Sequence, residues 1–338
     1  VPTQNHNAFL LWQSGQQSFH QFLDYKNPDD LERARTFYQG ALTYDSTYAD
    51  AIVGLGFVYR FTRHTGSIEN FFDSILIVSE RALSFDSQCA EAYILRFGYY
   101  DGFKDDRIKA IECLNKAIEI NPNLPGPYLF RANTNWYHYS KYLEAVQDYE
   151  AARIRNKGGL IEHIFYSFLG NTYKKLGIYD VAEEYYKMSF DYHGDSATYF
   201  NELANIEHCK ADFLKSSELE LNAYAMNGKE EDVGYISLEN LIVQERYDEA
   251  IRWTKLFDKY WPEGNHAEHA NRGFINWQSG NEERAEQLFS QLIQSKWDLS
   301  REALEVKIWW DVNYFMVHAF KEDYDSAYTY LEKVAHLN

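Results

Sequence analysis

A repeat of about 34 residues constrains this chain more than any other feature. The stretch 169–190 reads as a helix, a turn at Gly177 and a second helix, with small residues at Gly170 and Ala182. Moved forward by 34 residues, the same pattern places Ala204 at the position of Gly170. A single helical hairpin cannot bury its own apolar stripe, so repeated hairpins must stack on one another and share a continuous core.

The repeat predicts an all-α fold, a solenoid of about nine helix-turn-helix units that occupies residues 1–338 as one domain. The predicted second helices are centred near Ala34–Ala41, Ala82, Ala110–Ala117, Ala145–Ala152, Ala182, Ala223, Ala250, Ala285 and Ala327. Residues 1–89 hold the first two units with an insertion at 62–70, residues 90–299 hold the regular repeats, and residues 300–338 form the C-terminal unit. Only six prolines interrupt the chain, which favours long helices over many short strands.

Small residues are expected where the two helices of a unit cross. A larger side chain at Gly170 or Gly273 would push the two backbones apart, and Ala182 and Ala285 face these positions from the second helix. The units that start near Ala90 and Tyr128 each carry one extra residue relative to the repeat.

A period of 34 residues with small residues at two fixed places resembles the tetratricopeptide repeat (TPR) from end to end of the chain. The resemblance implies a right-handed superhelix whose concave groove is lined by the first helix of each unit. Residues 1–59 open with a PT-x-N-x-x-A pattern and resemble the TPR region of bacterial multidomain regulators. In those regulators a helix-turn-helix or nucleotide cyclase domain and a TolB-like domain precede the repeats. Together with the start at Val1, this predicts that the chain is a segment of a longer protein.

The charge balance and the cysteines argue against several classes of function. The formal net charge is −18 without a block of Lys or Arg, so the surface is acidic and direct nucleic-acid binding by this segment is not expected. Cys89, Cys113 and Cys209 show no CxxC spacing, so neither a disulfide framework nor a zinc site is predicted. The chain contains no uncharged apolar run of 18 residues that could span a membrane.

Signatures of catalysis are missing from the sequence, and we predict neither a cofactor nor a catalytic residue. There is no phosphate-binding GxxxxGK[ST], no HExxH and no GxSxG. His266 and His269 lie one helical turn apart, but two imidazoles rarely hold zinc, so we expect solvated groups at a helix start. His208 and Cys209 are neighbours on a helix and point about 100° apart, too far for a hydrogen-bonded dyad.

The groove is the predicted binding site, because asparagines recur just after the small residue of successive first helices. An amide both donates and accepts, so a row of amides can hold the backbone of an extended peptide, as in TPR adaptors. The candidate ligand-binding residues are Asn133, Asn171, Asn201, Asn205, Asn271, Lys174, Tyr235 and Trp277. The simpler interpretation, which we favour for the asparagines, is that they are tolerated polar residues of the groove. For each aromatic residue, core packing is the better interpretation.

The resulting functional hypothesis is a non-catalytic sensor module of a bacterial signalling or transcription regulator, which binds a peptide, protein or small ligand in the groove. One alternative is a free-standing scaffold for protein complexes. Another is a substrate-positioning subunit whose catalytic domain lies elsewhere. A homodimer is left open, and so is the compartment, either the cytoplasm or the extracytoplasmic side of a membrane-anchored regulator.

Overall fold

The computed structural model describes residues 3–61, 68–156, 162–228, 236–260 and 266–294, together with single positions between 317 and 332. Sixteen α-helices lie in these residues: α1 (His6–Tyr25), α2 (Pro28–Tyr44), α3 (Ala49–Phe61), α4 (Ile68–Phe85), α5 (Ala90–Tyr99), α6 (Arg107–Ile120), α7 (Pro125–Tyr139), α8 (Tyr142–Arg155), α9 (Glu162–Lys175), α10 (Tyr179–His193), α11 (Ser196–Cys209), α12 (Phe213–Asn227), α13 (Leu238–Val243), α14 (Tyr247–Tyr260), α15 (His266–Gln278) and α16 (Glu282–Gln294).

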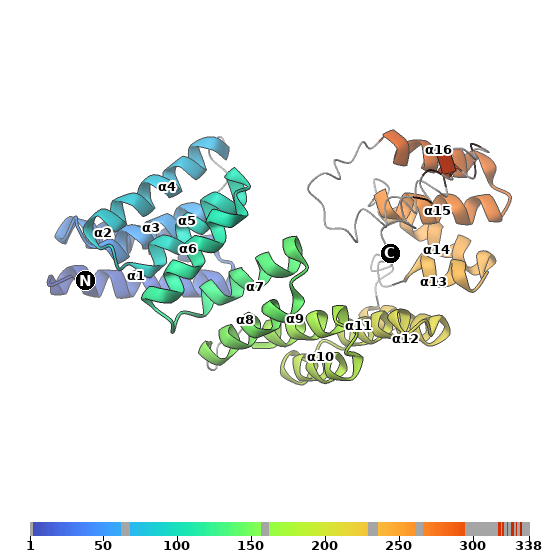
Figure 1. Cartoon of the computed structure of the whole chain (residues 1–338), viewed down its shortest axis with the longest axis horizontal. Coiled ribbons are helices and arrows are strands. Elements are labelled where there is room, and N and C mark those ends of the chain that lie inside the picture. The colour runs from blue at the N-terminus through green and yellow to red at the C-terminus, as the bar shows by residue number, and fades with distance from the viewer. Residues whose placement is uncertain are drawn as a thin grey trace. The chain divides into compact units, whose positions relative to one another are not determined.

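Consecutive helices form antiparallel pairs, as the repeat predicts (Figure 1). The even-numbered helices α2 to α16 contain the first eight predicted second helices, so the all-α, TPR-like architecture is confirmed. Helix α4 begins at Ile68, inside the stretch 62–70 that was expected to be an insertion. The ninth second helix lies largely outside the described residues, although Ala327 itself is described and buried.

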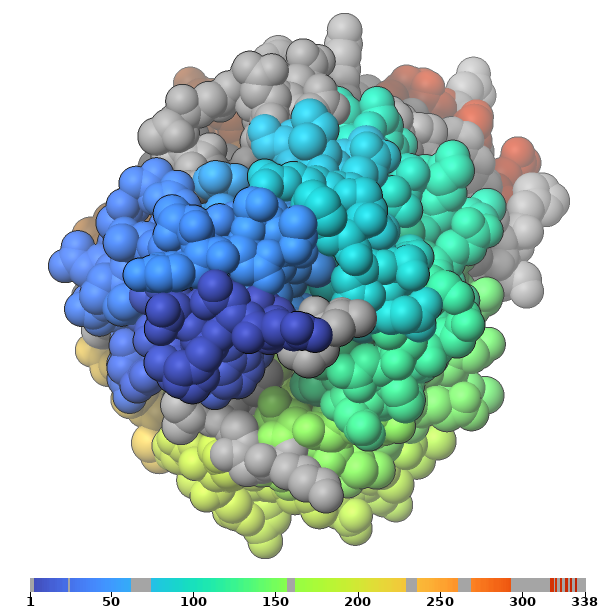
Figure 2. Space-filling model, turned by 90° about the vertical axis from the view of Figure 1, so that its left-hand side faces the viewer, coloured from blue at the N-terminus to red at the C-terminus, as the bar shows by residue number. Residues whose placement is uncertain are grey.

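Two compact units divide the chain. Unit 1 comprises residues 1–136 and 141–165, and unit 2 comprises residues 137–140 and 166–338. Figure 2 shows unit 1 from its N-terminal side, with the blue, cyan and green helices packed against one another. Each unit has its own apolar clusters, around Tyr38 and Leu95 in unit 1 and around Phe257 and Phe289 in unit 2.

An aromatic ring fills the space where α1, α2 and α3 approach one another. Tyr38 of α2 is 1% exposed and lies between Gly15 of α1 and Gly54 of α3. A methyl group added at Gly15 would come within 2.7 Å of the Tyr38 ring, and one added at Gly54 within 2.6 Å. The ring therefore occupies the space that a larger residue would need, and the three helices approach one another through it.

The same contact recurs in unit 2, where the repeat places small residues opposite the second helix. An added methyl at Gly170 would lie 2.7 Å from the Tyr186 ring, and one at Gly273 would lie 2.5 Å from the Phe289 ring. The expectation that these glycines sit at close helix crossings is confirmed.

A matched pair of glycines in unit 1 tests this packing. Gly15→Ala should lower the free energy of unfolding by about 1–3 kcal/mol, because the methyl group overlaps a buried ring. Gly40→Ala meets only a Leu11 methyl at 3.4 Å and should be neutral or stabilising by up to about 1 kcal/mol, since alanine is the better helix former. Denaturant unfolding of both variants measures the difference, and equal effects would contradict the packing role of Gly15.

The turn between the two helices of a unit uses one residue in the left-handed conformation. These residues are Lys26, Asp105, Ser140, Gly177, Ala211, Glu245 and Gly280, with φ between 51° and 78°. In the unit that starts near Ala90, a π-helical turn at Tyr100–Lys104 precedes this position. Such a turn accommodates one residue more than an α-helical turn.

Ala211 is one of the turn residues whose Cβ strains the left-handed conformation, at φ 62°. Ala211→Gly should raise the free energy of unfolding by about 0.5–1 kcal/mol. The reverse change at the equivalent turn, Gly177→Ala, should lower it by about 1 kcal/mol. Thermal unfolding of the two variants checks these opposite signs, and a destabilised Ala211→Gly would contradict the strain argument.

Candidate functional site

Polar contacts join neighbouring first helices of unit 2 along one side. The Lys174 ammonium of α9 lies 3.0 Å from the Glu202 carboxylate of α11. Further along, the Asn271 amide of α15 donates to Glu239 of α13 at 3.3 Å. Lys174 and Asn271 are predicted site residues, and the structure places both in contacts between first helices. Polar side chains thus join α9 to α11 and α13 to α15.

A tyrosine hydroxyl fixes the asparagine that follows the small residue. In unit 2 the Tyr186 hydroxyl donates to Oδ1 of Asn171 at 2.9 Å. In unit 1 the Tyr149 hydroxyl donates to Oδ1 of Asn133 at 2.7 Å. Because the amide oxygen is engaged in both cases, each side chain is oriented with Nδ2 directed elsewhere.

Burial and the charge of Glu202 raise the pKa of Tyr186, which keeps its phenol protonated and donating. The Lys174 ammonium lies 5.6 Å from the centre of the Tyr186 ring. Asn171, Lys174, Tyr186 and Glu202 therefore form one group, contributed by α9, α10 and α11. We refer to these four residues as the amide site.

The remaining predicted residues have different surroundings. Asn205 is exposed on α11, and Asn201 lies one turn before it and is half-buried. Trp277 packs edge-on against Phe274 and Phe320, with ring centroids 5.8 and 5.3 Å apart, which is the expected core role. Tyr235 lies outside the described residues.

His269 corrects one sequence-based expectation. Helix α15 does begin at His266, but the His269 side chain is only 4% exposed, so it is not a solvated group. The neighbouring residues explain the difference, since Ala270 and Ile275 of the same helix are fully buried and turn this face of α15 toward the core.

A buried polar network, which sequence reasoning missed, connects α11, α12 and α13. Nδ2 of Asn240 donates to the Glu220 carboxylate at 2.5 Å and to the Ser216 hydroxyl at 2.8 Å. The Ser237 backbone N–H donates to the other Glu220 oxygen at 3.1 Å. Oδ1 of Asn240 lies 2.6 Å from Nδ1 of His208, which is partly exposed. The network therefore leads from the interior of the repeat toward the surface.

The register of the repeat explains where this network forms. Tyr186 and Phe289 lie four residues after Ala182 and Ala285, and Glu220 lies four residues after Ser216 at the same position of its helix. A carboxyl group thus takes the place of a core aromatic ring. An acidic residue at this position was the signal that could have revealed the network, because a buried carboxylate requires polar partners.

The carboxyl group of Glu220 titrates far above its ordinary range. Burial raises the pKa of Glu220 to about 7, and the hydrogen bonds from Ser237 and Asn240 only partly oppose this shift. The folded state therefore holds a proton that the unfolded chain releases near its ordinary pKa. The stability that this proton provides is complete at pH values below the ordinary pKa and disappears as the pH rises through about 7.

We expect the free energy of unfolding of unit 2 to fall by about 2–3 kcal/mol between pH 4.5 and pH 8 because of Glu220. Glu220→Gln should remove most of this dependence, since its amide stays neutral at every pH. Glu218→Gln, on the exposed side of the same helix, should retain it. Urea unfolding across this pH range is the measurement, and identical pH profiles for the two variants would contradict the assignment.

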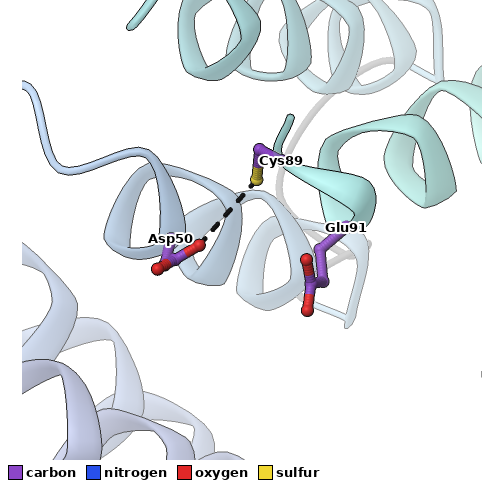
Figure 3. A group of neighbouring side chains, drawn as sticks. All are labelled: Asp50, Cys89 and Glu91. Carbon is purple, nitrogen blue, oxygen red and sulfur yellow. Dashed lines mark hydrogen bonds between the residues drawn. The ribbon is translucent and has the colours of Figure 1, made fainter. Parts of the chain in front are cut away.

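A thiol and two carboxyl groups meet in unit 1 (Figure 3). Sγ of Cys89 lies 3.9 Å from Oδ1 of Asp50, and a carboxylate oxygen of Glu91 lies within 4.8 Å of both groups. Burial raises the pKa of Cys89 to about 12 and also raises the pKa values of Asp50 and Glu91. A nucleophilic cysteine needs a lowered pKa, so Cys89 lacks the activation that a thiolate nucleophile requires.

Within the described parts of the chain, every helix is too short or too polar to cross a lipid bilayer.

Comparisons with known proteins agree with this architecture. Residues 93–124, which run from α5 to the turn after α6, match the tetratricopeptide repeat family model. No curated protein sequence matches the chain significantly.

Several solved structures resemble the chain. The Cut9–Hcn1 hetero-tetramer of the APC/C has a TM-score of 0.54 at 14% identity, and the match covers 84% of this chain and 52% of that one. A tetratricopeptide repeat protein from Parabacteroides merdae has a TM-score of 0.44 at 15% identity, with 89% and 99% covered. Pseudomonas aeruginosa PilF has a TM-score of 0.48 at 16% identity, with 65% and 94% covered. Only the Cut9–Hcn1 structure has a TM-score above 0.5 among these three, and at 14% identity this similarity supports the fold alone.

Proposed function

We propose that this tetratricopeptide repeat protein is a non-catalytic scaffold that binds an extended segment of a partner protein along the first helices of unit 2. The observation that carries the proposal is the amide site. Tyr186 engages the oxygen of Asn171, so the Nδ2 group is left to donate, and no described residue accepts from it. A backbone carbonyl of a bound segment is the natural acceptor for such a donor.

The charges at the amide site favour a backbone ligand over a terminal carboxylate. Lys174 is already paired with Glu202 at 3.0 Å, and both side chains are largely buried. A partner that used Lys174 would have to separate this pair, which is costly for buried charges. The ion pair presents little net charge to a ligand, whereas the chain as a whole carries a formal charge of −18. Neutral or basic segments are therefore the preferred partners.

The scaffold interpretation has more support than the sensor interpretation. The latter rests on the resemblance of residues 1–59 to bacterial regulators, and the solved structures compared above add nothing to it. The alternative of catalysis has less support still. Burial raises the pKa of Cys113 to about 11, as it raises that of Cys89, so neither thiol has the lowered pKa of a cysteine nucleophile. We therefore regard the scaffold as the better proposal and the sensor as its extension within a longer protein.

A peptide-display selection against the purified full chain tests the proposal. Synthetic copies of the selected peptides should bind Asn171→Ala about tenfold more weakly than the unmodified chain, since one hydrogen bond contributes about 1.4 kcal/mol. Asn123→Ala, in an exposed turn of unit 1, should bind them unchanged.

Photo-crosslinking locates the same peptides independently. A benzophenone side chain at Asn205, on the exposed face of α11, should capture the peptide, and one at Leu214, exposed at the start of α12, should not. Unchanged affinity of Asn171→Ala together with capture only at Leu214 would overturn the proposal.

A further inference from the structure

Arg272 of α15 is a fully buried cation with two unused donors. Its side chain is 0% exposed, and its Nη2 atom contacts the Asp258 carboxylate of α14. Nε and Nη1 are buried and have no hydrogen-bond partner among the described residues. Buried donors are nearly always satisfied in folded proteins, and those of a charged group are especially costly to leave unpaired.

A second guanidinium shares the same carboxylate. Nη2 of Arg284, on α16, lies 2.7 Å from the Asp258 oxygen that Arg272 contacts. Two cations thus face one anion, which leaves an excess positive charge in a chain of strongly negative total charge. Burial and the repulsion of Arg284 lower the pKa of Arg272 to about 10, which reflects this lack of compensation.

Unit 1 contains an arginine at the same position of the repeat, and each of its three guanidinium nitrogens has an acceptor. Arg131 precedes the small residue Ala132, just as Arg272 precedes Gly273. Nε and Nη2 of Arg131 donate to the two carboxylate oxygens of Asp148 at 2.8 and 2.7 Å, and Nη1 donates to Oδ1 of Asn115 at 2.5 Å. All three nitrogens of this guanidinium therefore have acceptors.

No described residue gives Arg272 the acceptor that Asp148 gives Arg131. Asp148 lies three residues after Ala145 on its helix, and the corresponding residue after Ala285 is Leu288. A leucine offers no acceptor, so the second helix of this pair leaves the guanidinium incomplete. What is missing is a group with the chemistry of a carboxylate.

We propose that Arg272, Arg284 and Asp258 form a binding site for a compact oxyanion, a phosphate or carboxylate group, which accepts from one of the unused donors of Arg272. A planar guanidinium suits such an anion, because its N–H groups match the spacing of the oxygens. Asp258 and Arg284 keep 33% and 31% of their side chains exposed, so solvent reaches the ion-pair cluster on their side. This site lies apart from the amide site and does not depend on the proposed scaffold function.

Titration of the full chain with inorganic phosphate, and separately with acetate, tests the site. At constant ionic strength adjusted with sodium chloride, phosphate should raise the unfolding temperature in a saturable manner. Acetate should do the same if a carboxylate suffices, and only phosphate will act if the ligand is a free phosphate. Calorimetric titration gives the dissociation constant.

Three variants separate a built site from a general salt effect. Arg272→Leu, which introduces the residue found at the equivalent position 169, should weaken phosphate binding at least about tenfold, the effect of losing a charged hydrogen-bond donor. Arg252→Leu, at an exposed arginine of α14, should bind as the unmodified chain does. Leu288→Asp supplies the missing carboxylate and should abolish the phosphate dependence while keeping Arg272.

Equal responses of the Arg272 and Arg252 variants, or no saturable response of the unmodified chain to either anion, would overturn the proposal. If Leu288→Asp does not fold, the comparison of the two arginine variants still decides the question.

Discussion

The close approach of helices around a buried ring is the contact on which the rest of this structure depends. Tyr38 fills the space between Gly15 and Gly54, and neither glycine can gain a methyl group without meeting the ring. Because the ring sets the distance between successive first helices, it also sets which side chains of those helices can touch. In unit 2 the Tyr186 ring lies in the same way against Gly170, and its hydroxyl group reaches Asn171.

The same position of the repeat decides whether the interior is apolar or polar. Where Tyr186 occupies it, the hydroxyl at the end of the ring reaches Asn171 and orients the amide. Where Glu220 occupies it, the core aromatic ring is replaced by a network that runs through Asn240 to His208. One substitution at one register therefore converts a packing contact into a titratable element, at the expense of stability above neutral pH.

A second position of the repeat, occupied by Asp148 or Leu288, determines whether the arginine of the first helix has a carboxylate acceptor. Asp148 provides two acceptors for Arg131, whereas Leu288 provides none for Arg272, and Nε and Nη1 of Arg272 have no partner among the described residues. The repeat thus holds two kinds of polar site, an amide and a guanidinium, for which we propose a protein backbone and an oxyanion as the respective ligands. Both arise from single residues placed on an otherwise uniform helical frame, and neither requires catalytic chemistry.

The sequence by itself determined the helical pairs, because the spacing of small residues reports directly on where helices must cross. It also predicted that Asn171 and Lys174 lie on one first helix, because their positions follow from the repeat. It did not reveal the partners of these residues: Tyr186 and Glu202 come from two other helices, and contacts between helices depend on their packing distance. The network around Glu220 and the incomplete Arg272 were likewise decided by the tertiary structure. Burial and the presence or absence of a facing acceptor are properties of the packed helices, which local sequence pattern does not encode.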